Sequence, residues 1–541
     1  MYNLGLILKD EGKYADAVDT LYRAAWDYEY ASAAYYQLAQ ISAVRGNAAQ
    51  AVHEAEMAVA YNGMNIDAKN LLTTLSRKAG ESERAAILSG EVLEIDPLNY
   101  YASAEQLALG LISKSEFAKL LRGVSESYLE LALYYLNNGF ESDAEAILKD
   151  AESVKPYPTV EYWLGWFADR NGDKDAAAKW FAAAEAGDMD YVFPFRLETV
   201  KSLEKAIEYN PNAVMAWYYL GNLWYQKQPA KAMSCWEKAV ELKPDFAMAL
   251  RNLGWGCHYF TGELRKGADW YKKAIAADKD GNAIFLTECD EILEQLNAPL
   301  DERYELFAGK ESLYEKRYDS ETRAIKLRIL KGEYEQVLDK LLTRFYSRRE
   351  HIEDLHDIYV DACMLSGFRE WKNGNNAKAL EYMLMTDEYP ANHGYAHLEY
   401  YARDAQVYYN IGMAYEKVGD AAKAREYYEK AAAVEVKSVD CAYNYEKALA
   451  MLKLDPKANV NPMFREMLSF GEKSVTDYVE RFFESFDYGP RPEDVNTKAY
   501  YIQGLAWKAL GKESKARGCF VKALGQRNDN VWANYYLNNI K

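Results

Sequence analysis

Several features that mark other protein classes are scarce in this chain of 541 residues. The 13 prolines and 31 glycines are few for this length, which argues against a fold built of strands and tight turns. No apolar run reaches the roughly 20 residues that a membrane-spanning helix needs. No signal peptide precedes the first helical pattern, and we therefore expect a cytoplasmic protein.

Positively charged residues are also fewer than negatively charged ones. The 65 lysines and arginines face 83 aspartates and glutamates, which leaves a formal net charge of −18. This balance argues against nucleic acid or an anionic membrane as the partner. Residues 341–349 (LLTRFYSRR) are the best candidate for a local basic patch, and we interpret them as a solvated helix end. The six cysteines form no CxxC pair, which predicts buried free thiols in a reducing compartment.

Motifs for catalysis and for cofactors are missing as well. The sequence holds no G-x-S-x-G element, no Walker loop and no Rossmann fingerprint. Acidic residues are so abundant that pairs of them carry no information about a glycosidase. We therefore predict a protein that is not an enzyme and has no cofactor.

Two pairs of histidines raise the question of a metal site. His351 and His356 are five positions apart, which separates their imidazoles by about 140° around a helix. His393 and His397 have the i, i+4 spacing of zinc ligands, with Glu399 nearby, but a glycine interrupts any helix between them. No third ligand follows at a recognised spacing, so we predict ordinary polar roles and no bound metal.

The residues that are plentiful favour helices. Alanine, leucine, glutamate and lysine dominate, and these are the strongest helix formers. Hydrophobic residues make up 50% of the chain and charged ones 27%, as in an ordinary folded protein. Tyrosine is unusually common at 46, and its apolar ring with a polar tip suits half-buried helix faces and interfaces.

One stretch, residues 213–245, indicates how these helices pair. Its spacing matches W-x2-L-G-x2-Y…A-x3-F…P, the tetratricopeptide repeat pattern, with tryptophan at two of the aromatic positions. Gly221 and Ala232 are small enough for two antiparallel helices to approach closely, and Pro244 ends the second helix. We expect the space beside the small residues to be filled by Trp217, Leu220, Trp224 and Trp236.

The first hundred residues repeat with a period of 34, the length of such a unit. The residues that recur in register are Leu4, Leu38 and Leu72, then Gly12, Gly46 and Gly80, then Ala17, Ala51 and Ala85. A helical hairpin of this kind cannot bury its own faces, so each unit needs a neighbour. We therefore predict an all-α superhelical solenoid of tetratricopeptide repeats, several of them degenerate.

The spacing divides the chain into four segments. We expect repeat units over 1–189 with a helical spacer at 99–123, central units over 190–280, degenerate hairpins over 281–400, and further units with a capping helix over 401–541. Residues 487–496 (DYGPRPEDVN) are predicted to be an exposed loop. Met1 lies where the first helix should already have begun, and we infer a fragment or a covered end.

Specific joints of the array carry a resemblance to a bacterial family. They are LLRG at 120–123 with YLELALYYLNNG at 128–139, FPFRLE at 193–198, RNLGW at 251–255 and EYPANHG at 388–394. The chain resembles, over nearly its whole length, the C-terminal part of large proteins with an N-terminal mutarotase-like domain of unknown function. The resemblance implies a link to carbohydrate metabolism through that missing domain, and it implies no activity for the array itself.

A concave surface is the remaining candidate for a binding site. The first helices of successive hairpins line the inner face of such arrays. The side chains predicted to project there are Tyr162, Trp166, Arg196, Tyr218, Asn222, Tyr225, Arg251, Trp255 and His258. Asn222 and Asn252 match the asparagines of the carboxylate clamp that grips chaperone C-termini, but its lysine position is a tyrosine here. The opposite interpretation is that these aromatics pack between repeats.

These observations predict that the chain is a scaffold that binds a protein or a peptide. The leading hypothesis is a concave aromatic groove that docks on the missing N-terminal domain. One alternative is that the array completes the sugar pocket of a carbohydrate-active enzyme. The other is an adaptor that binds a peptide of a separate protein.

Overall fold

A small residue on one helix faces a large side chain on the next helix throughout the chain. An ideal Cβ on Gly221 would lie 2.4 Å from Nε1 of Trp236, so only glycine allows the two helices to pack this closely. The same pairing joins six further hairpins, at Gly5–Leu21, Gly165–Phe181, Gly254–Tyr271, Gly367–Met383, Gly412–Tyr428 and Gly504–Phe520. Helices that share this contact form antiparallel pairs, and the pairs build the fold.

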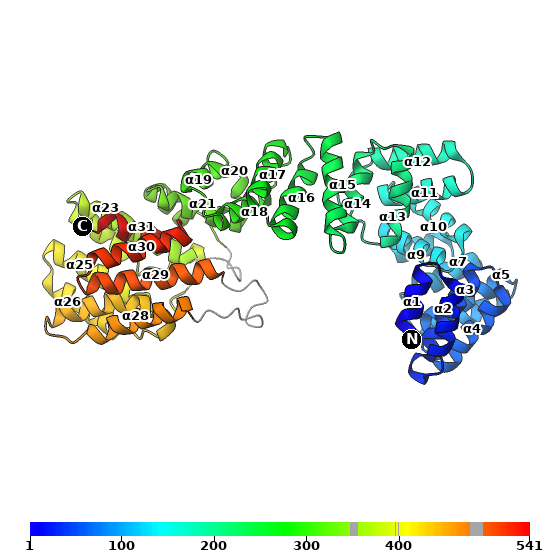
Figure 1. Ribbon diagram of the computed structural model, residues 1–541, viewed down its shortest axis with the longest axis horizontal. Helices are drawn as coiled ribbons and strands as arrows, with labels where there is room; N and C mark the ends of the chain where they lie inside the picture. The colour runs from blue at the N-terminus through cyan, green and yellow to red at the C-terminus, as the bar shows by residue number, and fades with distance from the viewer. Residues whose placement is uncertain (347–354, 395, 399, 477–490, 541) are drawn as a thin grey trace. The chain divides into compact units, whose positions relative to one another are not determined.

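The computed structural model describes residues 1–346, 355–394, 396–398, 400–476 and 491–540. These residues form 31 α-helices, three short 3-10 helices and one π-helix, and the described part contains no strand. The chain divides into two compact units, unit 1 (Met1–Pro244) and unit 2 (Asp245–Lys541). Figure 1 shows the order of the helices in each. The fold is all-α, as predicted.

Unit 1 contains the period-34 repeats at its start. Its helices are α1 (Tyr2–Asp10), α2 (Tyr14–Ala24), α3 (Tyr28–Val44), α4 (Ala48–Tyr61), α5 (Ile66–Lys78), α6 (Ser82–Ile95), α7 (Tyr100–Ala108), α8 (Lys114–Leu121), α9 (Ser125–Asn137), α10 (Glu141–Val154), α11 (Pro158–Arg170), α12 (Lys174–Ala186), η1 (Leu197–Thr199), α13 (Val200–Tyr209), α14 (Val214–Trp224) and α15 (Pro229–Leu242). The recurring alanines at 17, 51 and 85 are fully buried, which confirms their predicted role as close-packing residues.

The predicted spacer at 99–123 forms α7 and α8, and α7 is packed into the interior of unit 1. Glu105 on α7 is fully buried, and its carboxylate accepts hydrogen bonds from Thr74 Oγ1 (2.8 Å), Arg77 Nε (2.7 Å) and the Tyr135 hydroxyl (2.7 Å). Arg77 NH2 also donates to Asp143 Oδ1 at 2.9 Å. Because a buried carboxylate is stable only when it is paired, this network fixes α5, α7, α9 and α10 against one another.

Unit 2 continues with hairpins that are less regular. Its helices are α16 (Ala247–Gly256), η2 (Cys257–Thr261), α17 (Leu264–Ala277), α18 (Ile284–Gln295), α19 (Leu300–Phe307), α20 (Glu311–Tyr314), α21 (Tyr318–Leu330), α22 (Tyr334–Thr343), α23 (Leu355–Lys372), α24 (Asn376–Met385), η3 (Ala391–His393), α25 (Asp404–Val418), α26 (Ala421–Ala433), η4 (Ser438–Tyr443), α27 (Asn444–Leu454), α28 (Asn461–Thr476), α29 (Pro492–Ala509), α30 (Glu513–Gln526) and α31 (Val531–Asn539). The π-helix η2 follows the glycine-rich end of α16, where a loosened hairpin was expected.

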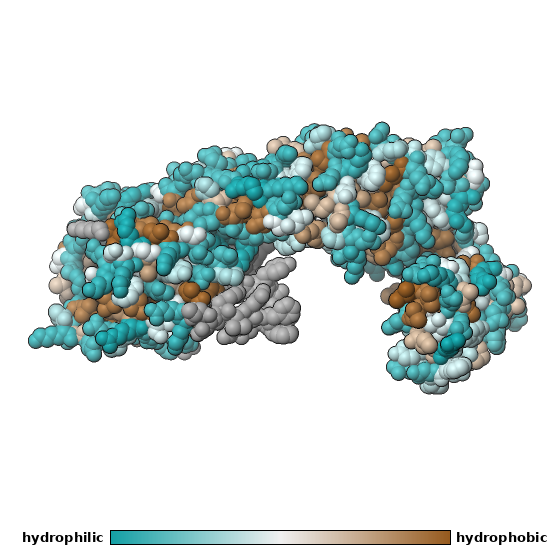
Figure 2. Space-filling model, viewed as in Figure 1, coloured by the Kyte–Doolittle hydropathy of each residue, from teal (hydrophilic) through white to brown (hydrophobic). Residues whose placement is uncertain are grey.

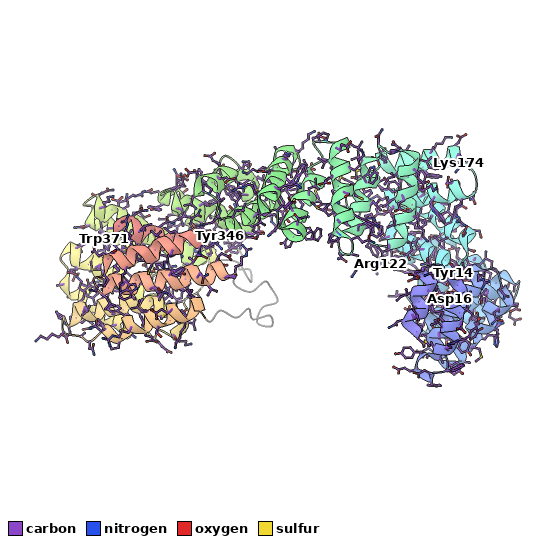
Figure 3. All side chains as sticks on the ribbon, in the orientation of Figure 1. Tyr14, Asp16, Arg122, Lys174, Tyr346 and Trp371 are labelled. Carbon is purple, nitrogen blue, oxygen red and sulfur yellow. The ribbon has the colours of Figure 1, made fainter. Side chains whose placement is uncertain are left out.

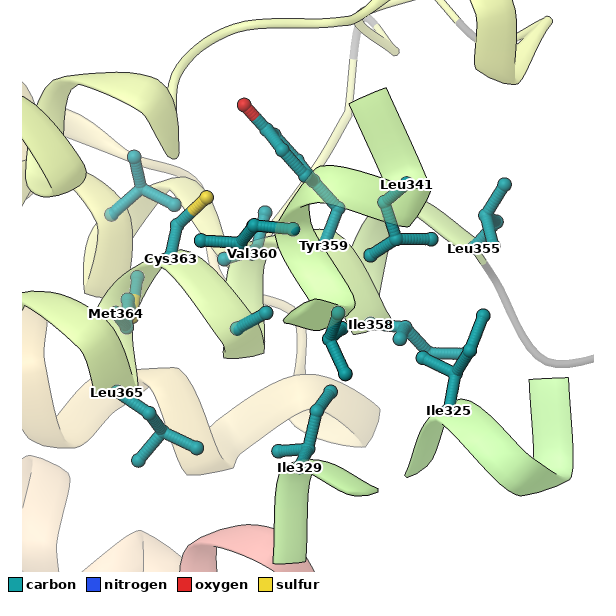
Figure 4. Packing of buried hydrophobic residues seen from close by; sticks show 14 of the residues in the cluster. Ile325, Ile329, Leu341, Leu355, Ile358, Tyr359, Val360, Cys363, Met364 and Leu365 are labelled. Atoms are coloured by element: carbon teal, nitrogen blue, oxygen red, sulfur yellow. The ribbon is translucent and has the colours of Figure 1, made fainter. Parts of the chain in front are cut away.

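The largest hydrophobic cluster of unit 2 surrounds α23. Leu355, Tyr359 and Cys363 on this helix are fully buried against Ile325 and Leu341 of the neighbouring hairpin (Figure 4). Side chains of α25 and α31 complete the cluster. The core is therefore built from helices that are far apart in sequence, and it gives unit 2 its long-range contacts.

The end of the chain closes unit 2 on itself. Trp532 Nε1 on α31 donates to Asp361 Oδ1 on α23 at 2.8 Å, and the rings of Tyr535 and Phe368 stack at 4.9 Å. Asn528 Nδ2 donates to the Ala298 carbonyl at 2.7 Å. The last helix, α31, packs on α23 through its aromatic residues and ends in the exposed Asn538 and Asn539, and its role as a capping helix remains a prediction.

Several smaller predictions meet the structure here. Residues 492–496 of the loop predicted at 487–496 belong instead to α29, which begins at Pro492, a favourable first helical residue; 487–490 lie outside the described residues. Five of the six cysteines are buried, Cys519 is half-buried, and all are free. Leu220 and Trp236 are buried as expected, whereas Trp217 and Trp224 are only half-buried.

Among the described residues, no helix is long and apolar enough to cross a bilayer. The four-segment division remains a prediction.

The basic stretch predicted at 341–349 is described only in part. Residues 347–349 lie outside the described residues. Arg344 NH1 lies 3.3 Å from Glu315 Oε2, and the Tyr346 hydroxyl, on the residue labelled in Figure 3, donates to Glu321 Oε1 at 3.3 Å. These described members are thus engaged with carboxylates of the same unit.

Candidate functional site

The most exposed aromatic surface of unit 1 lies on an extended segment, residues 191–197, which we call the aromatic ribbon. It follows α12 and ends at Leu197, the first residue of η1, at the place in the chain where the first helix of a hairpin would stand before α13. Alternate residues point to solvent: Tyr191 is 85% exposed, Phe193 70%, Phe195 58% and Leu197 56%. Val192 and Pro194 between them are buried. The alternation is that of an extended chain with one face against the protein.

Two contacts hold the aromatic ribbon against the inner helices of unit 1. The Tyr157 hydroxyl lies 3.3 Å from the Tyr191 carbonyl oxygen and 2.5 Å from Glu126 Oε1. Arg196 NH2 donates to Glu130 Oε1 at 2.9 Å. The backbone enters the ribbon with a positive φ of 61° at Tyr191, a conformation that non-glycine residues rarely adopt. The apolar face therefore stays exposed because the polar groups fix the segment.

Arg196 contacts a neighbouring aromatic ring, and its carboxylate partner is not the nearby Glu198. Its guanidinium carbon lies 5.5 Å from the centre of the Phe195 ring, a cation–π arrangement. The ion pair is with Glu130 of α9, because the ribbon runs beside that helix. Glu198 instead accepts a hydrogen bond from Asn137 Nδ2 at 2.9 Å.

Carboxylates surround the ribbon. Glu126 and Glu130 lie on α9 and Glu198 follows the ribbon, while Asp188 and Asp190 precede it. Burial raises the pKa of Glu126, the carboxyl closest to Tyr157. On α11, burial and then the nearby Glu152 raise the pKa of Glu161 to about 7. The surroundings of the apolar face are thus predominantly acidic.

The other predicted groove residues of unit 1 fall into two groups. Tyr162 and Tyr218 are buried, and the Tyr162 hydroxyl donates to Glu185 Oε2 at 3.3 Å, so neither ring is presented to solvent. Trp166, Asn222 and Tyr225 are half-exposed. The ring of Trp166 lies under the Arg170 guanidinium at 4.8 Å.

Asn222 has a structural contact that bears on the carboxylate-clamp comparison. Its Oδ1 accepts a hydrogen bond from Trp236 Nε1 at 3.0 Å. The same indole packs on Gly221, so the asparagine satisfies a nitrogen that close helix packing brings toward it. In unit 2, the second clamp-like position, Asn252, is buried and its Oδ1 accepts from Arg251 NH1 at 3.3 Å.

The three groove residues predicted in unit 2 also have partners there. Arg251 Nε donates to Glu288 Oε2 at 2.8 Å, and His258 Nε2 lies 2.7 Å from Gln295 Nε2. The Trp255 ring packs on Tyr259 with centroids 4.6 Å apart. Burial lowers the pKa of His258. A binding role for these residues remains a prediction, since their present contacts lie within the fold.

His356, His393 and His397 lie around the rings of Tyr359 and Tyr389, but His393 and His397 bond to different groups. His393 Nε2 lies 2.7 Å from the Leu341 carbonyl oxygen, whereas His397 Nε2 lies 2.9 Å from Asp404 Oδ2. His356 is buried and stacks on Tyr389 at 3.9 Å, and His351 and Glu399 lie outside the described residues. Among the described residues, no group of three or more histidine, cysteine or acidic side chains is placed to hold a metal ion.

Sequence reasoning singled out Arg196 but missed the ribbon around it. The signal was present as a nearly continuous apolar run with a proline at its centre, YVFPFRL at 191–197, which is unfavourable for a helix. Such a run indicates an extended segment but does not say which of its side chains are covered. That choice depends on the contacts with Tyr157 and Glu130.

Comparisons with known proteins agree with the helical hairpins. Family models of the tetratricopeptide repeat match residues 129–191 and 405–435. Among solved structures, the chain is similar to MamA (21% identity, 38% of this chain and 94% of that chain, TM-score 0.17). It is also similar to PilW, a type IV pilus biogenesis factor (18%, 48% and 98%, TM-score 0.20).

A third structure is that of YrrB, described as a tetratricopeptide protein with an unusual peptide-binding site (18% identity, 42% of this chain and 93% of that chain, TM-score 0.16). The two family-model matches support a protein-interaction scaffold. The described part of the chain is an all-α array of helical hairpins, of which residues 129–191 and 405–435 match models of the tetratricopeptide repeat.

Proposed function

We propose that this chain is a non-catalytic scaffold that holds a folded protein domain on the aromatic ribbon of unit 1. The observation that carries the proposal is the row of four apolar side chains, Tyr191, Phe193, Phe195 and Leu197, each more than half exposed. Exposed aromatics that alternate along a fixed backbone offer contact area at low conformational cost. The half-exposed Trp166 and Tyr225 of the same unit are our proposed additional contacts.

The chemistry of the partner follows from what surrounds the ribbon. The apolar face is bordered by the carboxylates of Glu126, Glu130, Glu198, Asp188 and Asp190. A complementary surface has an apolar centre and a basic rim, which steers association and fixes orientation. The family that the sequence resembles supplies a specific partner of this kind, its N-terminal mutarotase-like domain. We propose that domain as the occupant of the ribbon.

The test is a binding titration between this chain and the isolated N-terminal domain of a protein of that family. The double substitution Phe193→Ser and Phe195→Ser is expected to weaken binding by at least about tenfold, because large aromatic anchors are worth about 2 kcal/mol or more each. The free energy of unfolding of unit 1 should change by less than about 0.5 kcal/mol, because both rings are exposed.

A matched control is Val521→Ser, which removes an exposed apolar side chain, 53% accessible, on α30 of unit 2. It should leave binding unchanged.

Two outcomes would contradict the proposal. One is binding that survives the double substitution. The other is a titration in which mono- or oligosaccharides bind the chain alone, which would favour the completion of a sugar pocket. Binding of short peptides but not of the domain would favour a peptide adaptor.

A further inference from the structure

Unit 2 contains a cavity of about 390 Å³ that the interaction surface of unit 1 does not involve. Its walls come from α21, α23, α29 and α31, with Arg403 and the end of η4 between them. One wall exists only because the chain closes on itself, through the hydrogen bond from Trp532 Nε1 to Asp361 Oδ1 at 2.8 Å. A volume of this size suits a small molecule. We call it the central pocket.

An ion triad forms one side of the central pocket. Arg403 is buried, and its NH1 donates to Asp357 Oδ1 at 2.8 Å and to the Asp357 carbonyl at 3.1 Å. Its NH2 donates to Asp361 Oδ1, which also accepts from Trp532. One guanidinium therefore neutralises only one of two carboxylates, and the triad carries an excess negative charge.

The other charges of the lining do not cancel this excess. Asp529 is paired with Lys326 of the lining, whose Nζ lies 3.7 Å from its Oδ2, and with two cations from outside the pocket. Arg303 NH1 donates to its Oδ2 at 2.9 Å and Arg527 Nε to its Oδ1 at 3.2 Å. Asp440 has only a neutral donor, the Tyr400 hydroxyl at 2.7 Å. Lys498 lies on the exposed side of α29 at the pocket and forms no ion pair with the described residues.

Several polar atoms in the central pocket have no partner in the described part of the chain. The bonds of Asp361 to Arg403 and Trp532 both use Oδ1, which leaves Oδ2 without one. The hydroxyls of Tyr443 and Tyr501 make no hydrogen bond with a described residue either. Together with the Trp532 ring, these residues combine carboxylate oxygens with aromatic faces. That combination stabilises a positively charged nitrogen by charge-assisted hydrogen bonds and by cation–π contact.

We propose that the central pocket binds a small molecule that carries a protonated amine. The ammonium group lies against the free oxygens of Asp357 and Asp361, and the rest of the ligand packs on Tyr443, Tyr501 and Trp532. Lys498 at the rim supplies a counter-charge for a carboxylate, so a zwitterion such as an amino acid binds more tightly than a simple amine. The overall charge of −18 favours the approach of cations.

The test uses the full chain and four probes of similar length: 1,4-diaminobutane, 4-aminobutanoate, 1,4-butanediol and succinate. Calorimetric titration and the melting temperature of unit 2 are the readouts, since a ligand that binds only the folded state stabilises it. We expect binding by both amines and none by the diol or by succinate. Binding by the diol as tight as that of the amines, or binding by succinate alone, would overturn the proposal, as would no binding by any probe.

Substitutions locate the site. Asp361→Asn keeps the shape and is expected to weaken both amines by at least about tenfold, because it removes a charged hydrogen-bond acceptor. Lys498→Gln is expected to weaken 4-aminobutanoate alone. Glu429→Gln, an exposed carboxylate on α26, is the matched control and should change nothing.

A second variant keeps the test decisive if Asp361→Asn does not fold. Tyr443→Phe removes one hydroxyl and no hydrogen bond within the described residues, so the fold should persist. We expect it to weaken amine binding several-fold. Unchanged affinity in Tyr443→Phe and in every folded Asp361 variant would rule out the central pocket as the site.

Discussion

Unit 1 and unit 2 use aromatic side chains in opposite ways. In unit 1 an extended segment stands where the first helix of a hairpin would be, and Tyr191, Phe193 and Phe195 remain exposed. In unit 2 an additional helix, α31, follows the last hairpin, and its Trp532 and Tyr535 pack on α23. In unit 1 the missing helix leaves an apolar face exposed, and in unit 2 the added helix α31 covers the apolar face of α23. The reason is that a helical repeat buries its apolar faces only against a neighbouring repeat.

A second exposed apolar surface of unit 1 lies at its first helix. Leu4 and Ile7 on α1 and the preceding Met1 are each at least half exposed, and Figure 2 shows a hydrophobic patch on the part of the surface where α1 lies. No comparable stripe lies on α31, whose exposed flank is polar, with Asn538 and Asn539.

Both units nevertheless depend on buried charges, and removing these should have the largest effects. We expect Arg303→Met to destabilise unit 2 by about 3 kcal/mol, because it removes the buried guanidinium that Asp290 and Asp529 share. Asp290 then keeps only Arg323 as a cation, and Asp529 keeps Arg527 and the more distant Lys326. Glu105→Gln should destabilise unit 1 similarly, because it removes the charge that pairs with Arg77. Urea unfolding measures the loss, and hydrogen exchange shows which unit opens first.

The control for these substitutions is Arg425→Met, which removes an exposed ion pair on α26 and should cost less than about 1 kcal/mol. If Glu105→Gln destabilised unit 2 as much as unit 1, the two units would not unfold separately. That outcome would contradict the description of unit 1 and unit 2 as separately stabilised parts of the chain.

A pH dependence of intermediate size should distinguish the units. Burial raises the pKa of Glu446 in unit 2 from 4.5 to about 7, although Tyr536 OH and Gln406 Nε2 donate to its carboxylate. A raised carboxyl pKa means that the folded state holds the proton more tightly. Stability is therefore full below pH 4.5 and declines as the pH rises to about 7, by up to about 3 kcal/mol.

Glu446→Gln should reduce this decline in unit 2, where Glu321, whose pKa burial raises to about 6, contributes a smaller part. It should leave the decline that Glu161, also with a pKa of about 7, causes in unit 1. The measurement is the melting temperature of each unit between pH 5 and pH 8. Stability of unit 2 that rises over this range, or a decline that is equally large in Glu446→Gln, would show that another group controls it.

The smallest effects concern helical glycines of unit 1 that differ only in their neighbours. Gly221→Ala places a methyl group against the Trp236 ring, and we expect a loss of about 1–3 kcal/mol. Gly90→Ala on α6 meets no atom within 4 Å and should stabilise by about 0.5–1 kcal/mol, because alanine favours the helix. Denaturant midpoints measure both. Equal effects would mean that close packing at Gly221 does not hold the hairpin together.

Much of the fold was predictable from residue spacing. The alanines at 17, 51 and 85 and the pair Gly221–Trp236 are local to a hairpin, and the sequence period places them directly. The candidate site was harder to predict. Of the nine groove residues, Tyr162 and Tyr218 are buried, because a helix position facing the inner surface can still be covered by the next repeat. Residue spacing alone does not show whether the next repeat buries such a position.

The sequence by itself determined the helices, their pairing and the lack of a membrane-spanning helix, because these follow from local spacing and composition. Only the tertiary structure decided which aromatic residues are exposed, where α31 lies and that Arg403, Asp361 and Trp532 meet in one pocket. The physical reason is distance along the chain. Asp361 and Trp532 are 171 residues apart, and no local pattern specifies a contact that depends on how all the intervening repeats curve.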